Sequence, residues 1–139
     1  MKKKQLKEFK QLKAFTLTEI MVVLVIIGIL TLIALPNLQI WFTKAYETEA
    51  KLQLQHLAEL QKSHQQLNFK YSSDLTELGF EAPKTILQEG EARYSYEITT
   101  ASAGGFIAKA TAVADFDGDG IYNVWQINQG GKPERLIAD

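Results

Sequence analysis

The hydrophobic positions of this chain change their spacing along its length. Residues 15–35 are apolar on every side of a helix, with one charged residue among 21 positions. In the following stretch apolar residues recur at steps of three and four, which marks one face of a helix. We therefore predict one long helix from about Phe15 to about Asn68. Its predicted buried face consists of Ala50, Leu54, Leu57, Leu60, His64, Leu67 and Tyr71.

From residue 94 onward the pattern changes to the alternation typical of strands. Consecutive strands with tight turns favour an antiparallel sheet, and its apolar face should cover the amphipathic half of the helix. The predicted fold class is α+β, with the long helix packed on a small antiparallel sheet. The predicted inward positions are Tyr94, Tyr96 and Ile98, then Phe106, Ala108, Ala110 and Ala112, then Ile121, Asn123, Trp125 and Ile127.

The segment between the helix and the strands is predicted to be a connector. Asp74 followed by Glu77 resembles a capping box, and Gly79 suits the position just after a helix. A single short helical turn is therefore expected there. Residues 81–91 contain a proline and two glutamates near a glycine, and we expect a surface loop.

The apolar segment is long enough to anchor the chain in a membrane, because about 20 residues cross the hydrocarbon as a helix. A secretory signal would end in a small-residue cleavage site after its apolar core, but here the core runs on to Leu38. A buried helix of a soluble protein is disfavoured, since the remaining domain is too small to surround it. Pro36 removes a backbone donor, so a bend is expected near it. Trp41 and Phe42 follow the span and suit either a membrane interface or packing between subunits.

Charge is distributed unevenly along the chain. Residues 1–14 carry six Lys and one Glu, whereas residues 15–139 carry nine Lys or Arg and fifteen Asp or Glu. Positive-inside bias would keep the basic leader in the cytoplasm and place the acidic body outside it. Nucleic-acid binding by the lysines is disfavoured because they precede a membrane segment, so no nucleic-acid contact is inferred. The absence of cysteine excludes disulfides and thiolate metal sites.

The junction between leader and helix has a distinctive pattern. It reads Lys13-Ala14-Phe15-Thr16-Leu17-Thr18-Glu19 and is followed by Gly28, Pro36 and Asn37. This pattern resembles the class III signal of type IV pilin precursors and pseudopilins, and the resemblance covers about the first forty residues. It implies a peptidase that cuts between Ala14 and Phe15 and then methylates the new amino terminus of Phe15. The family usually has Gly where this chain has Ala14.

The resemblance also implies a pilin-like domain organisation and a set of partners. The partners are other copies of the chain in a helical filament, the prepilin peptidase, the pilus or type II secretion assembly machinery, and the inner membrane. The expected parts are a cleaved basic leader at 1–14, a transmembrane and assembly segment at 15–35, the amphipathic half of the helix at 36–70, and a globular connector and sheet at 71–139.

Glu19 is a carboxylate inside an otherwise apolar segment. Hydrocarbon penalises a charge by several kcal/mol, roughly 2.5 or more on insertion scales, so this carboxylate needs a partner. Cleavage after Ala14 would create a positive amine on Phe15, four residues away. Neutralising that amine, on the same chain or on a neighbour, would set subunit register, because breaking a buried pair costs roughly 3–5 kcal/mol. Gly28 and Pro36 are predicted to contribute to assembly by loosening the helix.

The acidic segment that begins at Asp115 matches the front of a calcium loop. Asp115, Asp117 and Asp119 stand at positions one, three and five, followed by Gly120 at six. The Ile121 carbonyl would serve position seven and Asn123 position nine. Position twelve should be a bidentate Glu but is Gln126. The alternative is a hairpin turn, in which Asp and Gly supply the turn geometry. Calcium therefore stays an open prediction, and no cofactor is required.

The sequence shows no catalytic constellation, such as a nucleophile beside a histidine base, so we do not expect an enzyme. The leading interpretation is a structural subunit of a type IV pilus-like filament, stored in the inner membrane and then assembled at the cell surface. One alternative is a pseudopilin of a type II secretion system, which would form a periplasmic pseudopilus. Another is a membrane-anchored binding domain that never polymerises.

Overall fold

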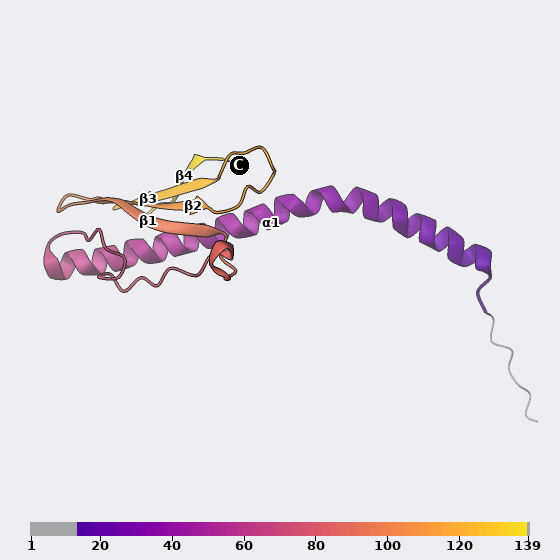
Figure 1. The fold of residues 1–139 in the computed structure, drawn as a ribbon, viewed down its shortest axis with the longest axis horizontal. Coiled ribbons are helices and arrows are strands. Elements are labelled where there is room, and N and C mark those ends of the chain that lie inside the picture. Colours follow the sequence, from indigo (N-terminus) through magenta and orange to yellow (C-terminus); the bar gives the residue numbers. More distant parts are fainter. Residues whose placement is uncertain (1–13, 139) are drawn as a thin grey trace, which may run out of the picture. The chain divides into compact units, whose positions relative to one another are not determined.

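The computed structural model describes residues 14–138, without the side chains of residues 36 and 37. Residues 1–13 of the expected leader therefore lie outside the described part. The elements follow the order α1 (Leu17–Asn68), the 3₁₀ helix η1 (Ile86–Gln88), β1 (Tyr94–Ala101), β2 (Phe106–Ala112), β3 (Val124–Asn128) and β4 (Glu134–Ile137) (Figure 1). The chain divides into two compact units that meet between Asn37 and Leu38.

The first unit contains the apolar half of α1. Its large apolar side chains, from Phe15 to Leu35, are between 46% and 79% exposed. The Thr31 hydroxyl donates to the Ile27 carbonyl at 2.7 Å, which satisfies a polar group inside this apolar stretch. Within the described residues, α1 is the helix that is long and apolar enough to cross a membrane. Pro36 lies inside α1 and does not end it.

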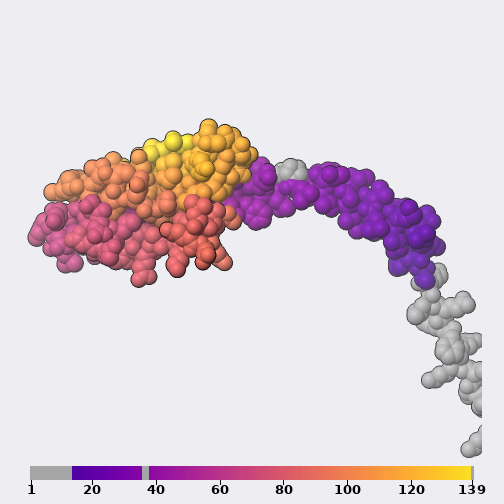
Figure 2. Space-filling view, viewed as in Figure 1, coloured from indigo at the N-terminus to yellow at the C-terminus, as the bar shows by residue number. Residues whose placement is uncertain are grey.

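The second unit packs the other half of α1 against a four-stranded antiparallel sheet in the order β1-β2-β3-β4. Figure 2 shows the orange and yellow strands lying over the magenta half of the helix. Tyr94 pairs with Ala112 across β1 and β2, and Ala110 pairs with Trp125 across β2 and β3. The inward residues of the strands form one hydrophobic core with α1, Leu78 and Phe80. The α+β prediction is confirmed.

Most of the predicted helix face is buried, but its end is not. Ala50, Leu54 and Leu57 are fully buried, whereas Leu67 is 77% exposed. At 100° per residue, Leu67 lies about 80° around the helix from Leu57, away from the centre of the buried stripe. The stripe instead continues through Gln61, which is fully buried. The prediction for Leu67 was wrong because spacing alone does not show where the sheet ends.

The connector forms turns in place of the expected short helix. Asp74 Oδ1 accepts from the Thr76 amide at 2.8 Å, and Gly79 has a positive φ of 70°, as its position suggested. Glu77 does not close a capping box with Asp74, because its carboxylate accepts from the Ser72 hydroxyl. The Asp74 amide donates to that same hydroxyl at 3.1 Å. The expected loop at 81–91 also contains η1, which the sequence analysis did not predict.

The strand predictions are correct for β1 and β2 and incomplete after them. Ile121 was expected to face inward but is 47% exposed. The chain is still turning there, since Gly118 and Gly120 both have φ near 86°, and β3 begins only at Val124. β4 was not predicted. All four of its residues are exposed, so it has no alternating pattern and depends on pairing with β3.

Candidate functional site

The amino-terminal end of α1 holds Glu19 in a capping box. Glu19 Oε2 accepts from the Thr16 amide at 2.8 Å and from the Thr16 hydroxyl at 2.9 Å. The Thr16 hydroxyl in turn accepts from the Glu19 amide at 3.2 Å. These bonds satisfy backbone donors that a helix start leaves unpaired. The sequence analysis missed Thr16, although Thr16-Leu17-Thr18-Glu19 is the T-x-x-E pattern that signals this arrangement.

The surroundings of Glu19 are apolar and uncovered in the single chain. A shallow depression is lined by Phe15, Thr18, Glu19, Val22 and Val23. Both bonds from Thr16 end on Oε2, so Oε1 retains the capacity to accept from a further donor. The site therefore presents one carboxylate oxygen on a surface that is otherwise suited to lipid or to another apolar helix.

The predicted processing site lies just before this helix. Ala14 and Phe15 are exposed and precede Leu17, the first residue of α1. The backbone at this bond is outside any helix or strand. A bond in such a segment is accessible to a peptidase, because no regular hydrogen bonding has to be broken first. Cleavage and methylation at Phe15 remain predictions.

The other two predicted assembly residues lie within α1. Gly28 is helical, and a Cβ added there would meet nothing within 4 Å. In the single chain, therefore, no packing contact requires a glycine at this position. Pro36 is also helical by backbone. The assembly roles of Gly28 and Pro36 remain predictions.

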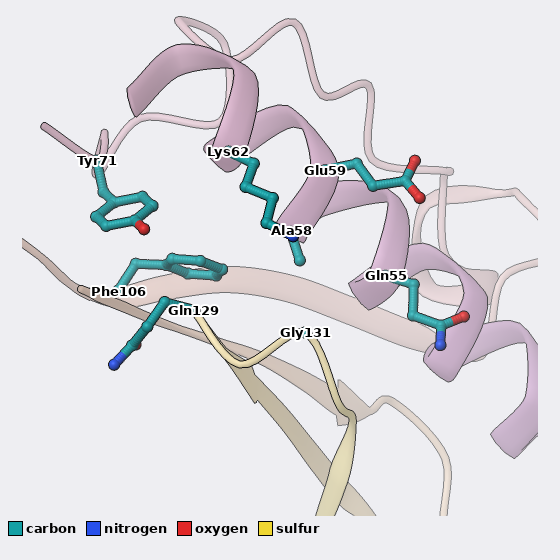
Figure 3. A pocket seen from close by; sticks show the side chains of 8 residues that line it. All are labelled: Gln55, Ala58, Glu59, Lys62, Tyr71, Phe106, Gln129 and Gly131. Atoms are coloured by element: carbon teal, nitrogen blue, oxygen red, sulfur yellow. The ribbon is translucent and has the colours of Figure 1, made fainter. Parts of the chain in front are cut away.

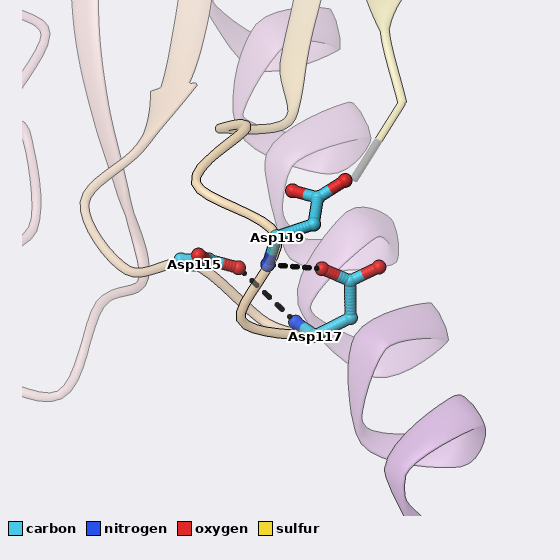
Figure 4. A group of neighbouring side chains, drawn as sticks. All are labelled: Asp115, Asp117 and Asp119. Atoms are coloured by element: carbon cyan, nitrogen blue, oxygen red, sulfur yellow. Dashed lines mark hydrogen bonds between the residues drawn. The ribbon is translucent and has the colours of Figure 1, made fainter.

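Asp115, Asp117 and Asp119 form an acidic loop between β2 and β3, with carboxylate oxygens within 4.8 Å of one another (Figure 4). Their side chains accept bonds from the loop's own backbone. Asp115 accepts from the Gly118 amide at 2.6 Å and from the Gly120 amide at 2.7 Å. These bonds lower the pKa of Asp115 below its ordinary value, and the bond from Gly120 contributes more than that from Gly118. The loop is thus ordered by its own carboxylates, as the turn alternative predicted.

The remaining predicted calcium ligands follow the acidic loop in sequence. Asn123 is fully buried, and its Nδ2 donates to Glu47 on α1 at 3.0 Å, while its Oδ1 has no hydrogen-bond partner among the described residues. Gln126 lies in β3 between the inward residues Trp125 and Ile127, so strand alternation turns it to the opposite face of the sheet. Ile121 donates its amide to Asp119 at 2.7 Å. The end of the matched loop thus belongs to a strand, whereas an EF-hand loop leads into a helix, and calcium binding stays a prediction.

Phe116 anchors the acidic loop to the body. Its ring lies 5.3 Å from the ring of Tyr46 on α1 and 6.0 Å from that of Tyr94 on β1. Glu47 follows Tyr46 on α1 and accepts from both Asn123 Nδ2 and Arg135 Nη1. The loop is consequently fixed to the helix by aromatic contacts on one side and by hydrogen bonds on the other.

A cleft of about 280 Å³ lies between α1, the start of β2 and the turn that joins β3 to β4 (Figure 3). Its floor is aromatic, and Glu59 and Lys62 stand on its helical wall. The lining contains no histidine, cysteine or serine. Its residues are Gln55, Ala58, Glu59, Lys62, Tyr71, Phe106, Gln129 and Gly131.

Both histidines, His56 and His64, contact neighbouring groups of the body. His64 Nδ1 lies 3.0 Å from the Lys70 carbonyl, and its Nε2 lies 3.4 Å from Glu77. The hydrogen bond from Ser72 is the main cause of a lowered pKa at Glu77, and His64 lowers that pKa further. His56 lies against Phe80, with ring centroids 6.0 Å apart.

Comparisons with known proteins agree with the amino-terminal geometry. Residues 10–35 match the family described as "Prokaryotic N-terminal methylation motif". The chain is 39% identical over 90 residues to the type IV major pilin protein PilA of Myxococcus xanthus (strain DK1622). The matched part is 65% of this chain and 38% of that relative, so the similarity spans well under two thirds of the relative's length.

Proposed function

We propose that this chain is a structural subunit of a type IV pilus-like filament, because residues 10–35 match the prokaryotic N-terminal methylation motif and the chain is similar to a type IV major pilin. In this proposal the precursor is anchored in the inner membrane with its body outside the cytoplasm. A prepilin peptidase cuts between Ala14 and Phe15 and methylates Phe15. Assembly machinery then transfers the subunit into a helical filament.

The observation that carries the proposal is the uncovered apolar half of α1 beside a complete core in the body. Every large apolar side chain from Phe15 to Leu38 is at least 46% exposed. An apolar surface of this extent marks a membrane or protein interface. Lipid and neighbouring apolar helices both cover it, so a subunit can pass from membrane to filament with little change in apolar exposure to water.

Glu19 is proposed to direct assembly through its free acceptor capacity. In the single chain the capping box with Thr16 satisfies one carboxylate oxygen. The other can accept from the amine of a processed Phe15, on the same chain or on a neighbour. Loss of one partner from such a pair, once it is buried among helices, costs roughly 3–5 kcal/mol. That cost is large enough to exclude a subunit from the filament.

The test is the intact mass of protein recovered from material sheared from the cell surface. The wild type should begin at Phe15 and carry one added methyl group. Glu19→Ala should be absent from the sheared fraction while its precursor remains in the membrane. Glu81→Ala, which removes an exposed carboxylate from the connector, is the matched control and should be sheared like the wild type.

The outcomes also separate the alternatives. A processed wild-type chain that is found only in periplasmic and membrane fractions would favour a pseudopilus of a type II secretion system. A wild-type chain that still carries residues 1–14 and is never shed would favour an anchored domain that does not polymerise. Normal incorporation of Glu19→Ala would contradict the assembly role of Glu19.

We also propose that the acidic loop binds calcium weakly. The supporting observation is the approach of three carboxylates to within 4.8 Å, which is unfavourable without a cation. Calcium at millimolar concentration should raise the unfolding temperature of the wild type more than magnesium does. Asp119→Asn should remove this difference, whereas Glu81→Gln should keep it. Equal shifts with both ions would leave the loop as a turn without a metal.

A further inference from the structure

A second cleft, of about 320 Å³, lies within the body where α1, the acidic loop and β4 meet. Figure 4 shows the loop with Asp117 beside α1. The cleft combines apolar, hydroxyl and charged groups of both signs. Its residues are Gln39, Ile40, Thr43, Lys44, Glu47, Phe116, Asp117 and Arg135.

The charges of this cleft favour a ligand that carries both signs. Arg135 Nη1 lies 3.1 Å from Glu47, so these two charges largely compensate each other. Lys44 on the helical wall and Asp117 on the loop wall remain as a cation and an anion. Asp117 accepts from the Asp119 amide through Oδ1, and its second oxygen can accept from a ligand. Ile40 and Phe116 add apolar surface between the walls.

The chain tethers this cleft close to the membrane-spanning segment. Ile40 is five positions after Leu35, and five residue steps reach at most about 18 Å even when fully extended. Trp41 and Phe42, which are 69% and 57% exposed, lie in the same turn as Ile40. Exposed aromatic residues beside a span are typical of the membrane interface, where lipid head groups lie. The cleft therefore has lipid head groups within reach of its charged walls.

We propose that this cleft binds the head group of a phospholipid that carries a primary amine. The phosphate lies toward Lys44, and the ammonium donates to Asp117. A choline head group bears no N–H and cannot donate to that carboxylate, so the cleft distinguishes the two lipids. The inference rests on the proposed membrane anchorage. It implies that a stored subunit holds a specific lipid, which it gives up on entering the filament.

The test uses the full chain in vesicles, followed by extraction in mild detergent and native mass spectrometry of retained lipid. The vesicles contain equal amounts of phosphatidylethanolamine and phosphatidylcholine. The wild type should retain phosphatidylethanolamine about tenfold over phosphatidylcholine, since hydrogen bonds between charged groups discriminate by that order. Lys44→Gln should lose retention of both lipids. Asp117→Asn should lose the preference while keeping the acceptor for the Asp119 amide, and Asp117→Glu should restore part of it.

Matched controls come from the other cleft, where Lys62→Gln and Glu59→Gln remove the same charges from α1. Both should retain lipid as the wild type does. Equal retention of the two lipids by a wild-type chain that stays with the vesicles overturns the head-group proposal and leaves the anchor intact. A wild-type chain that leaves the vesicles overturns the anchor and the head-group proposal together. A loss of preference in the controls equal to that in Asp117→Asn also overturns the head-group proposal.

Discussion

Gln61 is a buried polar residue that fixes the connector to α1. Its side chain is fully buried on α1, donates to the Ser72 carbonyl at 2.6 Å and accepts from the Ser72 amide at 3.0 Å. It thereby provides partners for both backbone groups of a buried connector residue, which would otherwise be unsatisfied. This one side-chain amide holds the connector against α1 by bonding its backbone as a neighbouring strand would.

Gln61→Leu should therefore destabilise the body although leucine is a better helix former and more apolar. Two buried backbone groups lose their partners, at about 1–3 kcal/mol each, so a loss of roughly 2–6 kcal/mol is expected. The measurement is urea unfolding of the detergent-solubilised chain, followed by circular dichroism. Gln66→Leu, on an exposed position of the same helix, should change stability little. Equal stability of the two variants would contradict this account of Gln61.

Asp115 makes the stability of the acidic loop depend on pH. Amides of Gly120 and Gly118 bond the ionised carboxylate and lower its pKa in the folded chain. A lowered folded pKa means that the contribution is present above the ordinary pKa, near 4, and is lost as pH falls through the folded value. Asp115→Asn should thus lower the unfolding temperature at pH 7, and its difference from the wild type should shrink toward pH 2. A difference that is constant with pH, as expected for Glu81→Gln, would contradict this role.

At the scale of the elements, β2 determines how closely α1 approaches the sheet. Its inward residues are Phe106 and three alanines, and Ala108 and Ala110 are fully buried. Small side chains on the strand leave room for Leu54 and Leu57 on the helix, which are also fully buried. The helix–sheet contact is consequently made of small residues on β2 and large ones on α1, so the side chains of the helix fill the space that the alanines leave.

A pair of leucines on α1 tests this description of the packing. Leu57→Ala should cost about 2–5 kcal/mol, because it removes a fully buried side chain and leaves a cavity. Leu67→Ala makes the same chemical change at a position that is 77% exposed, and it should cost less than about 0.5 kcal/mol. Chemical denaturation of both variants measures the difference. Similar losses would mean that Leu67 is covered in the body, as the sequence analysis had predicted.

At the scale of the whole molecule, the two units differ in how their apolar side chains are covered. Within the described residues the hydrophobic core lies entirely in the body, between Ala50 and Ile127. The first unit, up to Asn37, has no buried side chain among those described. The body therefore obtains its stability from its own core, while the apolar segment depends on lipid or on neighbouring subunits.

This separation predicts opposite effects for two variants. Glu19→Gln should leave the unfolding temperature of the body unchanged in detergent, because Glu19 contacts Thr16 and no core residue. Leu57→Ala should lower that temperature, yet the chain should still partition into membrane vesicles. Calorimetry and vesicle flotation measure the two properties. A body destabilised by Glu19→Gln would contradict the independence of the units.

The sequence by itself determined the features that depend on local pattern. The spacing of apolar residues predicted α1 and the inward faces of β1 and β2, because period and burial follow directly from backbone geometry. The uninterrupted apolar run predicted a span-length helix. The motif around Glu19 indicated the resemblance to type IV pilin precursors. Its T-x-x-E pattern is also present in the sequence, although the capping role of Thr16 was not predicted from it. Such signals need only residues that are close along the chain.

The tertiary structure alone decided features that depend on distant residues. β4 exists because β3 offers it a partner, and no apolar alternation of its own marked it. Asn123 is buried and donates its Nδ2 to Glu47, 76 positions earlier in the chain, a contact that the sequence did not predict. Leu67 is exposed because the sheet does not reach it, and Gln61 is buried because Ser72 returns to meet it. In each case the stability of the local structure depends on which distant segment packs against it. A single stretch of sequence does not contain that information.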